Sequence, residues 1–311
     1  MAIALRTAFG QILAKLGEEN NRFVVFTADS SGATGAGTFV QKFPERSFDV
    51  GIAEQNLISA AAGFSTIGVT TFVSGYGLFS TSRVADQIRN SVCYPNLNVK
   101  IVCSHVGLDA GNDGASHQTI EDLALMRAIP NIIILIPADA IELEAMLRFL
   151  LQHEGPAYMR TTRAAMGEVS EPTYTYRLGK APVLARGTDV TLIAAGVMVP
   201  RALEARKILE SRRVSAELIN CSTLKPLDRE TIVDSARKTG ALITAEDHNI
   251  LGGIGGAVSQ LLAEQQPTPM EFIGVRDTFG AAGDLHGLYA KYGMSSQHIA
   301  EAAERVIRRK K

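Results

Sequence analysis

Short runs of apolar and β-branched residues recur along the first half of this 311-residue chain, and stretches with helical spacing separate most of them. The runs predicted to be strands lie at 22–28, 47–50, 69–73, 99–104, 131–136 and 156–161. The predicted helices occupy 54–64, 80–92, 120–128 and 139–151. Because strands that alternate with helices usually pair in parallel, the pattern predicts an α/β fold with a mostly parallel sheet flanked by helices.

The alternation stops once and then resumes. Residues 169–188 are polar and contain Pro172 and Pro182, which predicts a linker. Beyond the linker, further predicted strands lie at 189–195, 214–220, 241–247 and 270–275. We therefore expect a first domain over residues 1–168 and a smaller α/β domain over 189–311, as the chain length also suggests.

Composition argues against several functions. Lys and Arg (31) nearly balance Asp and Glu (32), so no net charge favours nucleic acid or an anionic membrane. Apolar residues near the N-terminus recur at helical spacing, interrupted by Arg6 and Lys15, which predicts an amphipathic helix rather than a signal peptide. No apolar run approaches the roughly 20 residues that span a bilayer. Cys93, Cys103 and Cys221 form no CxxC motif, which favours a cytoplasmic location.

The unusual polar and glycine-rich segments follow the ends of predicted strands. They are residues 29–37, 51–56, 74–79 and 105–117, together with Arg163. Ligands of open parallel sheets bind beyond the carboxyl ends of the strands. We therefore expect these segments to share one edge of the first sheet and to form a site there.

The loop at 105–117 carries the densest set of functional groups. Its two histidines, His105 and His117, and its two aspartates, Asp109 and Asp113, could move protons and recognise hydroxyl groups, and the loop's glycines allow tight turns. The same residues also fit an ordinary surface loop that leads into a capped helix. Their spacing does not match a zinc site, so we expect no metal ligands in this chain.

Other candidate residues have two interpretations each. Glu54, which leads into an alanine-rich helix, is either a partly buried carboxylate that needs a partner or a charge that favours the helix N-terminus. Tyr76 and Phe79 fit either a stacking surface for a flat heterocycle or the core. Arg163 fits either a phosphate ligand or a solvated charge. Dinucleotide, P-loop and serine-hydrolase functions lack support, because GxGxxG, GxxxxGK[ST] and GxSxG are absent.

Taken in order, these stretches resemble the second half of transketolase, from about Ala4 to Ile307. DVGIAEQN resembles the segment with the family's activating glutamate, which implies that Glu54 hydrogen-bonds a ring nitrogen of the aminopyrimidine of thiamine diphosphate. GNDGASHQ resembles the family's GxDGxTHQ loop, which implies that Asp113 and His117 bind the donor sugar.

The resemblance extends to the rest of the site. SGYGLF is similar to the family's STFxxF, which implies that Tyr76 and Phe79 line the pyrimidine, with Tyr76 in place of the usual Phe. His105 and Arg163 match phosphate-binding residues of the family, and Arg6 is a candidate for another. On this basis the first domain is expected to be a pyrimidine-binding domain and the second a transketolase C-terminal domain.

One family motif is missing. Thiamine-diphosphate enzymes carry a GDG…NN motif that holds the Mg²⁺ ion of the diphosphate, and this sequence contains no GDG. The resemblance therefore implies a partner chain with that motif and the Mg²⁺, as in split transketolases, and an assembly of two chains of each kind. It also implies transfer of a two-carbon ketol unit between sugar phosphates, as in the pentose phosphate reactions of carbohydrate metabolism.

Three alternatives stay open. A deoxyxylulose-phosphate synthase carries a DGxTHQ loop but is normally one longer chain. A 2-oxoacid dehydrogenase beta subunit is also split, but its loops do not contain GNDGASHQ. A non-catalytic scaffold with this fold would have no chemical need for Glu54, Asp113 and His117 together.

Overall fold

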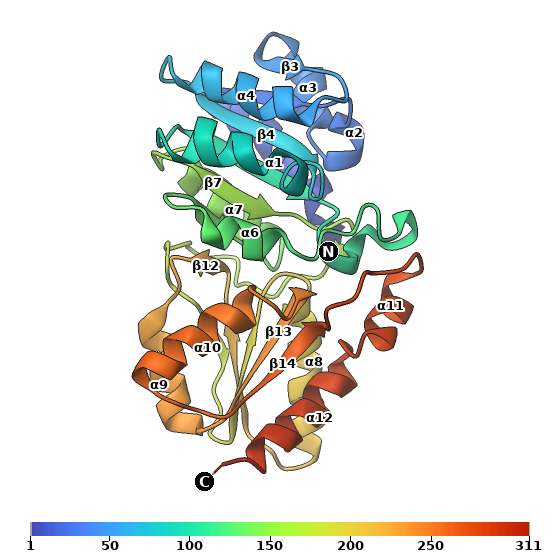
Figure 1. Ribbon diagram of the computed structural model, residues 1–311, viewed down its shortest axis with the longest axis vertical. Helices are drawn as coiled ribbons and strands as arrows, with labels where there is room; N and C mark the ends of the chain where they lie inside the picture. The colour runs from blue at the N-terminus through green and yellow to red at the C-terminus, as the bar shows by residue number, and fades with distance from the viewer. Residues whose placement is uncertain (1, 311) are drawn as a thin grey trace.

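The computed structural model describes residues 2–310; Met1 and Lys311, the outermost residues of the two predicted domains, lie outside it. Two α/β domains are stacked along the long axis of the molecule, each built on its own sheet (Figure 1). Both sheets are mostly parallel and flanked by helices, which confirms the predicted fold class.

The first domain is built on a seven-stranded sheet in the order β12-β6-β7-β5-β4-β2-β3. Its strands are β2 (Phe23–Thr27), β3 (Ser47–Asp49), β4 (Thr70–Tyr76), β5 (Val99–Ser104), β6 (Ile133–Leu135), β7 (Ala157–Arg160) and β12 (Thr223–Lys225). All neighbours pair in parallel except β12, which runs antiparallel to β6. Every residue of β2, β5 and β7 is buried, as expected for strands covered on both faces.

The second domain has a five-stranded sheet in the order β14-β13-β10-β11-β9. Its strands are β9 (Val183–Ala185), β10 (Val190–Ala194), β11 (Ala216–Asn220), β13 (Leu242–Asn249) and β14 (Met270–Val275). Only β9 is antiparallel to its neighbour. A separate ribbon pairs β1 (Ile3–Ala4) with β8 (Ala165–Met166) and so joins the two ends of the first domain.

Helices cover both sheets (Figure 1). In the first domain they are α1 (Leu5–Glu19), α2 (Ser31–Thr34), α3 (Gly37–Lys42), α4 (Glu54–Ser65), α6 (Asp122–Ala128) and α7 (Ala140–Leu150). In the second they are α8 (Met198–Ser211), α9 (Arg229–Thr239), α10 (Ile254–Gln265), α11 (Leu285–Lys291) and α12 (Ser296–Ile307). Between residues 2 and 310, no helix is both long and apolar enough to cross a membrane.

Several short segments differ from the predictions. The helix expected at 80–92 is instead a 3₁₀ turn, η2 (Ser82–Val84), one α-turn, α5 (Ala85–Gln87), and a π-helical turn, η3 (Ile88–Cys93). Near its start the Thr81 hydroxyl donates to the Gly77 carbonyl, a local bond that competes with regular helix formation. Strand β9 lies inside the predicted linker, and β12 crosses back from the second half of the chain to the first sheet.

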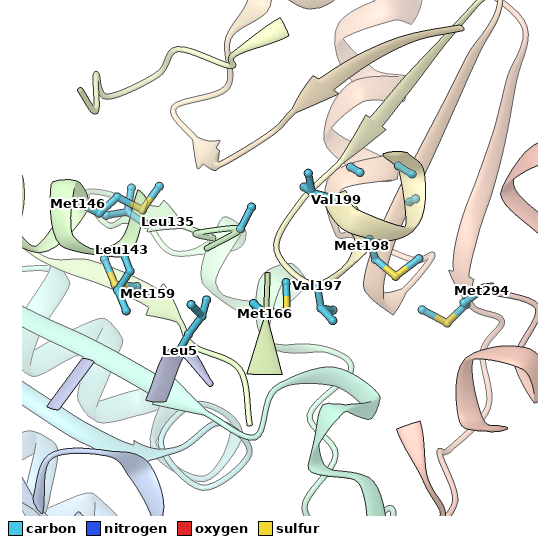
Figure 2. Packing of buried hydrophobic residues seen from close by; sticks show 14 of the residues in the cluster. Leu5, Leu135, Leu143, Met146, Met159, Met166, Val197, Met198, Val199 and Met294 are labelled. Carbon is cyan, nitrogen blue, oxygen red and sulfur yellow. The ribbon is translucent and has the colours of Figure 1, made fainter. Parts of the chain in front are cut away.

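The apolar core continues from one domain into the other. Figure 2 shows Met166 beside Val197, with Leu5 and Met159 on the side of the first sheet, and all four belong to one buried cluster. Buried apolar area stabilises by about 25 cal/mol per Å². The shared cluster therefore stabilises the contact between the two domains.

A buried ion pair lies at the domain junction. Asp122 and Arg160 are almost inaccessible, and Arg160 Nε donates to Asp122 Oδ2 at 2.8 Å. Burial opposes ionisation of Asp122, but the Arg160 charge outweighs it and lowers the pKa of the carboxyl group. Arg160 also donates from Nη1 to the backbone carbonyl of Asp247 in the second domain, at 3.0 Å. The pair therefore joins β7 and α6 to β13.

Asp122→Asn should destabilise the chain by about 3–5 kcal/mol, because it leaves the buried Arg160 charge without its partner. The free energy of unfolding in urea measures this loss. Asp234→Asn is the matched control, since Asp234 pairs with Arg237 on the exposed surface and its loss should barely move the unfolding curve. Equal stability of the Asp122 variant and the wild type would contradict the inferred role of the pair.

Candidate active site

The loops singled out in the sequence meet at one edge of the first sheet. Strands β3, β2, β4, β5 and β7 are parallel neighbours, so their carboxyl ends lie together. The segments after these strands include residues 51–56, 77–79, 105–117 and 161–164. The prediction of a shared edge is confirmed.

Glu54 is the first residue of α4 and is only 7% exposed. A buried carboxylate needs a partner, and Arg83 supplies one: its Nη1 lies 2.7 Å from Glu54 Oε2. The Arg83 guanidinium also lies 4.5 Å from the centre of the Phe79 ring. Arg83 therefore connects the carboxylate to the aromatic residues of the next loop.

Four rings form a cluster beside this pair. Tyr76 lies 4.5 Å from His105 and 5.7 Å from His117, measured between ring centres. Phe79 lies 5.1 Å from His117 and 6.0 Å from Tyr76. Tyr76 and Phe79 are partly exposed rather than buried in the core. A buried carboxylate next to partly exposed rings suits a flat heterocycle with ring nitrogens, so these residues fit the aminopyrimidine of thiamine diphosphate.

His105 occupies a left-handed backbone conformation (φ 59°) and is 2% exposed. Its Nε2 lies 3.4 Å from Nη1 of Arg6, and its Nδ1 lies 2.8 Å from the Ser104 hydroxyl. Because a guanidinium only donates, the contacts assign the proton to Nδ1 and leave Nε2 as the acceptor. Burial, with the charges of Arg6 and Arg163, lowers the pKa of His105 to about 4, so the ring is neutral at pH 7.

Two arginines and Asp113 complete the site. Arg163 Nη1 donates to Asp113 Oδ2 at 3.0 Å, and the same oxygen lies 3.9 Å from His105 Nε2. Arg6 Nη1 also donates to the carbonyl of Ala33 at 2.7 Å. Both guanidinium groups therefore lie around His105, Arg6 in direct contact with it and Arg163 through Asp113, and two nearby positive charges suit a phosphate group.

The structure thus brings together all eight residues predicted for the site. A continuous series of contacts runs from the carboxylate end to the arginine end and includes Glu54, Phe79, Tyr76, His117, His105, Asp113, Arg163 and Arg6. Arg83 is the one link in this series that the sequence did not indicate.

Two buried carboxylates lie behind the site. Asp109 accepts hydrogen bonds from the backbone N–H groups of Arg163 and Ala164, the latter at 2.9 Å. Burial raises the pKa of Asp109 to about 6. Asp247 of β13 accepts from the N–H of Leu108 at 2.9 Å. Asp109 lies within the predicted loop, so its position was a signal, but nothing near Asp247 in the sequence indicates its partner.

Comparisons with known proteins identify the family. Residues 1–168 match the pyrimidine binding domain of transketolase, and residues 179–299 match the transketolase C-terminal domain. A putative transketolase C-terminal section from Methanocaldococcus jannaschii is 41% identical over 300 residues, which cover 96% of this chain and 94% of that protein.

Two further comparisons define the extent of the likeness. A solved structure described as a split gene transketolase, inactive beta4 tetramer, is 44% identical with a TM-score of 0.93, covering 99% of this chain and 100% of that one. A 1-deoxy-D-xylulose-5-phosphate synthase from Desulforudis audaxviator is 37% identical over 97% of this chain, which spans only 48% of that enzyme. The chain therefore belongs to the transketolase family, of which it carries the pyrimidine-binding and C-terminal domains.

Proposed function

We propose that this chain is the C-terminal subunit of a thiamine-diphosphate-dependent transketolase that moves a two-carbon ketol unit from a ketose phosphate to an aldose or aldose phosphate. The observation that carries the proposal is the series of contacts from Glu54 to Arg163 at one edge of the first sheet. A carboxylate with aromatic rings stands at one end of it and two arginines at the other. The likeness to split transketolases supports the same function.

Glu54, Tyr76 and Phe79 form the cofactor end of the proposed site. When bound, thiamine diphosphate supplies the electron sink that carbon–carbon cleavage requires. Glu54 hydrogen-bonds a ring nitrogen of the aminopyrimidine, and its burial in α4 holds the carboxylate in place. Tyr76 and Phe79 line the pyrimidine with their partly exposed rings.

Asp113 and His117 form the sugar end, where they bind hydroxyl groups of the donor and hold or move protons. Arg163 and Arg6 bind the phosphate of the substrate. His105 belongs to the phosphate site through Arg6, whose guanidinium it contacts with the neutral Nε2. The charge at this end therefore comes from the two arginines, because His105 is uncharged at neutral pH.

The other half of the site comes from a partner. We propose that a chain with the GDG…NN motif holds Mg²⁺ and the diphosphate, in an assembly with two chains of each kind. The related split transketolase that is described as an inactive tetramer of beta chains supports this requirement. A cytoplasmic location is part of the proposal, since Cys93, Cys103 and Cys221 are free and buried. The domain limits at 168 and 189 are proposed with it.

A deoxyxylulose-phosphate-synthase-like reaction is the second candidate, favoured by the relative of that name. The products distinguish the two. A ketose phosphate donor leaves a shorter aldose phosphate, whereas a 2-oxo acid donor releases CO₂. Incubating the assembled complex with each donor and one aldose phosphate, and analysing the products by mass spectrometry, tests the proposal. We expect transfer from the ketose phosphate. Turnover with the 2-oxo acid as donor and none with the ketose phosphate would refute the proposed function.

Arg163→Ala should raise KM for phosphorylated sugars far more than for unphosphorylated ones. Loss of a charged hydrogen bond costs about 1.5–3 kcal/mol, which corresponds to about 10–150-fold. Steady-state kinetics of the assembled complex with matched pairs of sugars measures the difference. Arg22→Ala is the control, because Arg22 is exposed before β2, at the opposite edge of the sheet. Equal changes in KM for both kinds of sugar would show that Arg163 does not bind phosphate.

A further inference from the structure

We propose that Asp247, in the sheet of the C-terminal domain, is a positioning residue that fixes the loop of Asp113 and His117 in its working geometry. The inference rests on the proposed function for its kinetic consequences, but the anchoring itself concerns this chain alone. It assigns the second domain a part in the reaction, although all eight predicted site residues belong to the first.

Asp247 uses one carboxylate oxygen to bind the loop and the other to bind its own domain. The residue is 4% exposed at the carboxyl half of β13. Its Oδ1 accepts from the backbone N–H of Leu108 at 2.9 Å, and its Oδ2 accepts from the Tyr289 hydroxyl of α11 at 2.7 Å. Tyr289 is itself buried, so its hydroxyl fixes the position of the carboxylate that binds the loop. The loss of a buried hydrogen bond is costly, because it leaves a donor without a partner away from water.

Gly107 shows how closely the loop approaches this carboxylate. Its φ is +63°, and a Cβ placed on it would lie 2.3 Å from Asp247 Cγ. Only glycine combines this backbone conformation with such an approach. The contact between Asp247 and residues 107–108 therefore leaves no room for the loop to shift toward β13.

The far end of the same loop also binds the second domain. Gln118, which follows His117, donates from Nε2 to the carbonyl of Ala281 at 2.9 Å. Ala281 lies in the segment before α11, which Figure 1 shows beside the loop that follows β5. Asp109 binds the middle of the loop to Ala164. The segment with Asp113 and His117 is thus fixed at its start, middle and end.

The position of the loop with Asp113 and His117 matters for the sugar chemistry. Asp113 and His117 act on the sugar only if their side chains reach specific hydroxyl groups, and displacements of about 1 Å cost large factors in rate. Glu54 is the first residue of α4, on a different segment of the chain, and its ion pair is with Arg83 rather than with a group of the second domain. Loosening Asp247 should therefore impair the sugar steps and spare the step that depends on Glu54.

The test uses two variants that loosen the same contact from opposite sides. Asp247→Ala combined with Tyr289→Phe removes the acceptor for Leu108 without leaving a buried hydroxyl unpaired, and Gly107→Ala pushes the loop away. Asp247→Asn is the control, because its amide oxygen still accepts from Leu108. Amide hydrogen exchange over residues 106–118 should be about tenfold faster or more in both loosened variants and unchanged in the control.

Kinetics of the assembled complex give the second readout. For the loosened variants we expect kcat/KM for the ketose phosphate to fall about tenfold or more, with proton exchange at the cofactor's thiazolium carbon unchanged. Wild-type amide exchange in both variants would overturn the proposal, as would equal losses in the sugar and proton-exchange steps. A wild-type complex without ketol transfer would refute the proposed function, while amide exchange would still decide the anchoring.

Discussion

The purified chain, given thiamine diphosphate and Mg²⁺, should show no measurable ketol transfer, and addition of the GDG-bearing partner should restore it. The physical reason is that the residues proposed for this half of the site would hold the pyrimidine and the sugar phosphate, whereas the sequence lacks the GDG motif that would hold the diphosphate and its ion. Restored turnover should fall within the usual enzymatic range, about 1–10³ s⁻¹. The measurement is a coupled assay of aldose phosphate release at increasing ratios of partner to chain.

Stoichiometry adds a second criterion to this assay. Activity should rise in proportion to added partner and level off at one partner per chain, since each proposed site needs both. The partner alone is the control and should also be inactive. Robust turnover by this chain alone would contradict the split site.

Glu54→Gln in the assembled complex should lower kcat by about 10²-fold or more, the usual scale for loss of a proton-transfer group. Glutamine keeps the size and the position at the start of α4 but cannot take up or release the proton that a carboxyl group shares with a ring nitrogen. Glu45→Gln is the control, because Glu45 is an exposed carboxylate of the same domain. Its kcat should equal that of the wild type.

The structural alternative for Glu54 predicts a different result. A charge that only favours the helix N-terminus stabilises by about 0.3–1 kcal/mol, and its loss has no specific effect on turnover. Loss of the ion pair with Arg83 would add to the change in stability. A Glu54→Gln complex with normal kcat and a lowered unfolding temperature would therefore identify Glu54 as a structural residue.

Much of the fold follows from the sequence because its strands are long apolar runs in the interior of sheets. Runs such as those of β5 and β10 are buried throughout, so composition alone marks them. Strands β9 and β12 escaped prediction although β3, which is equally short and also lies at a sheet edge, was predicted; unlike β3, both run antiparallel to their neighbours, outside the repeated strand–helix pattern. Their positions depend on partners far along the chain, which local periodicity does not encode.

The residues of the site also include some that the sequence predicts and some that it does not. Candidates such as Glu54 and Asp113 follow strand ends, and parallel pairing alone brings strand ends together. Arg83 and Asp247 were missed because their roles depend on contacts between distant segments. Arg83 lies in a segment whose helix is broken into three kinds of turn, so its direction was not predictable from helical spacing.

One measurement tests the shared active site most directly. Exchange of the proton at the thiazolium carbon of the cofactor requires no sugar, so it reports only on how the two chains hold the cofactor. NMR can follow this exchange with the chain alone, the partner alone, the two together, and the two together with Glu54→Gln. We expect rapid exchange only in the wild-type mixture; rapid exchange with either chain alone, or in the Glu54→Gln mixture, would contradict the shared active site.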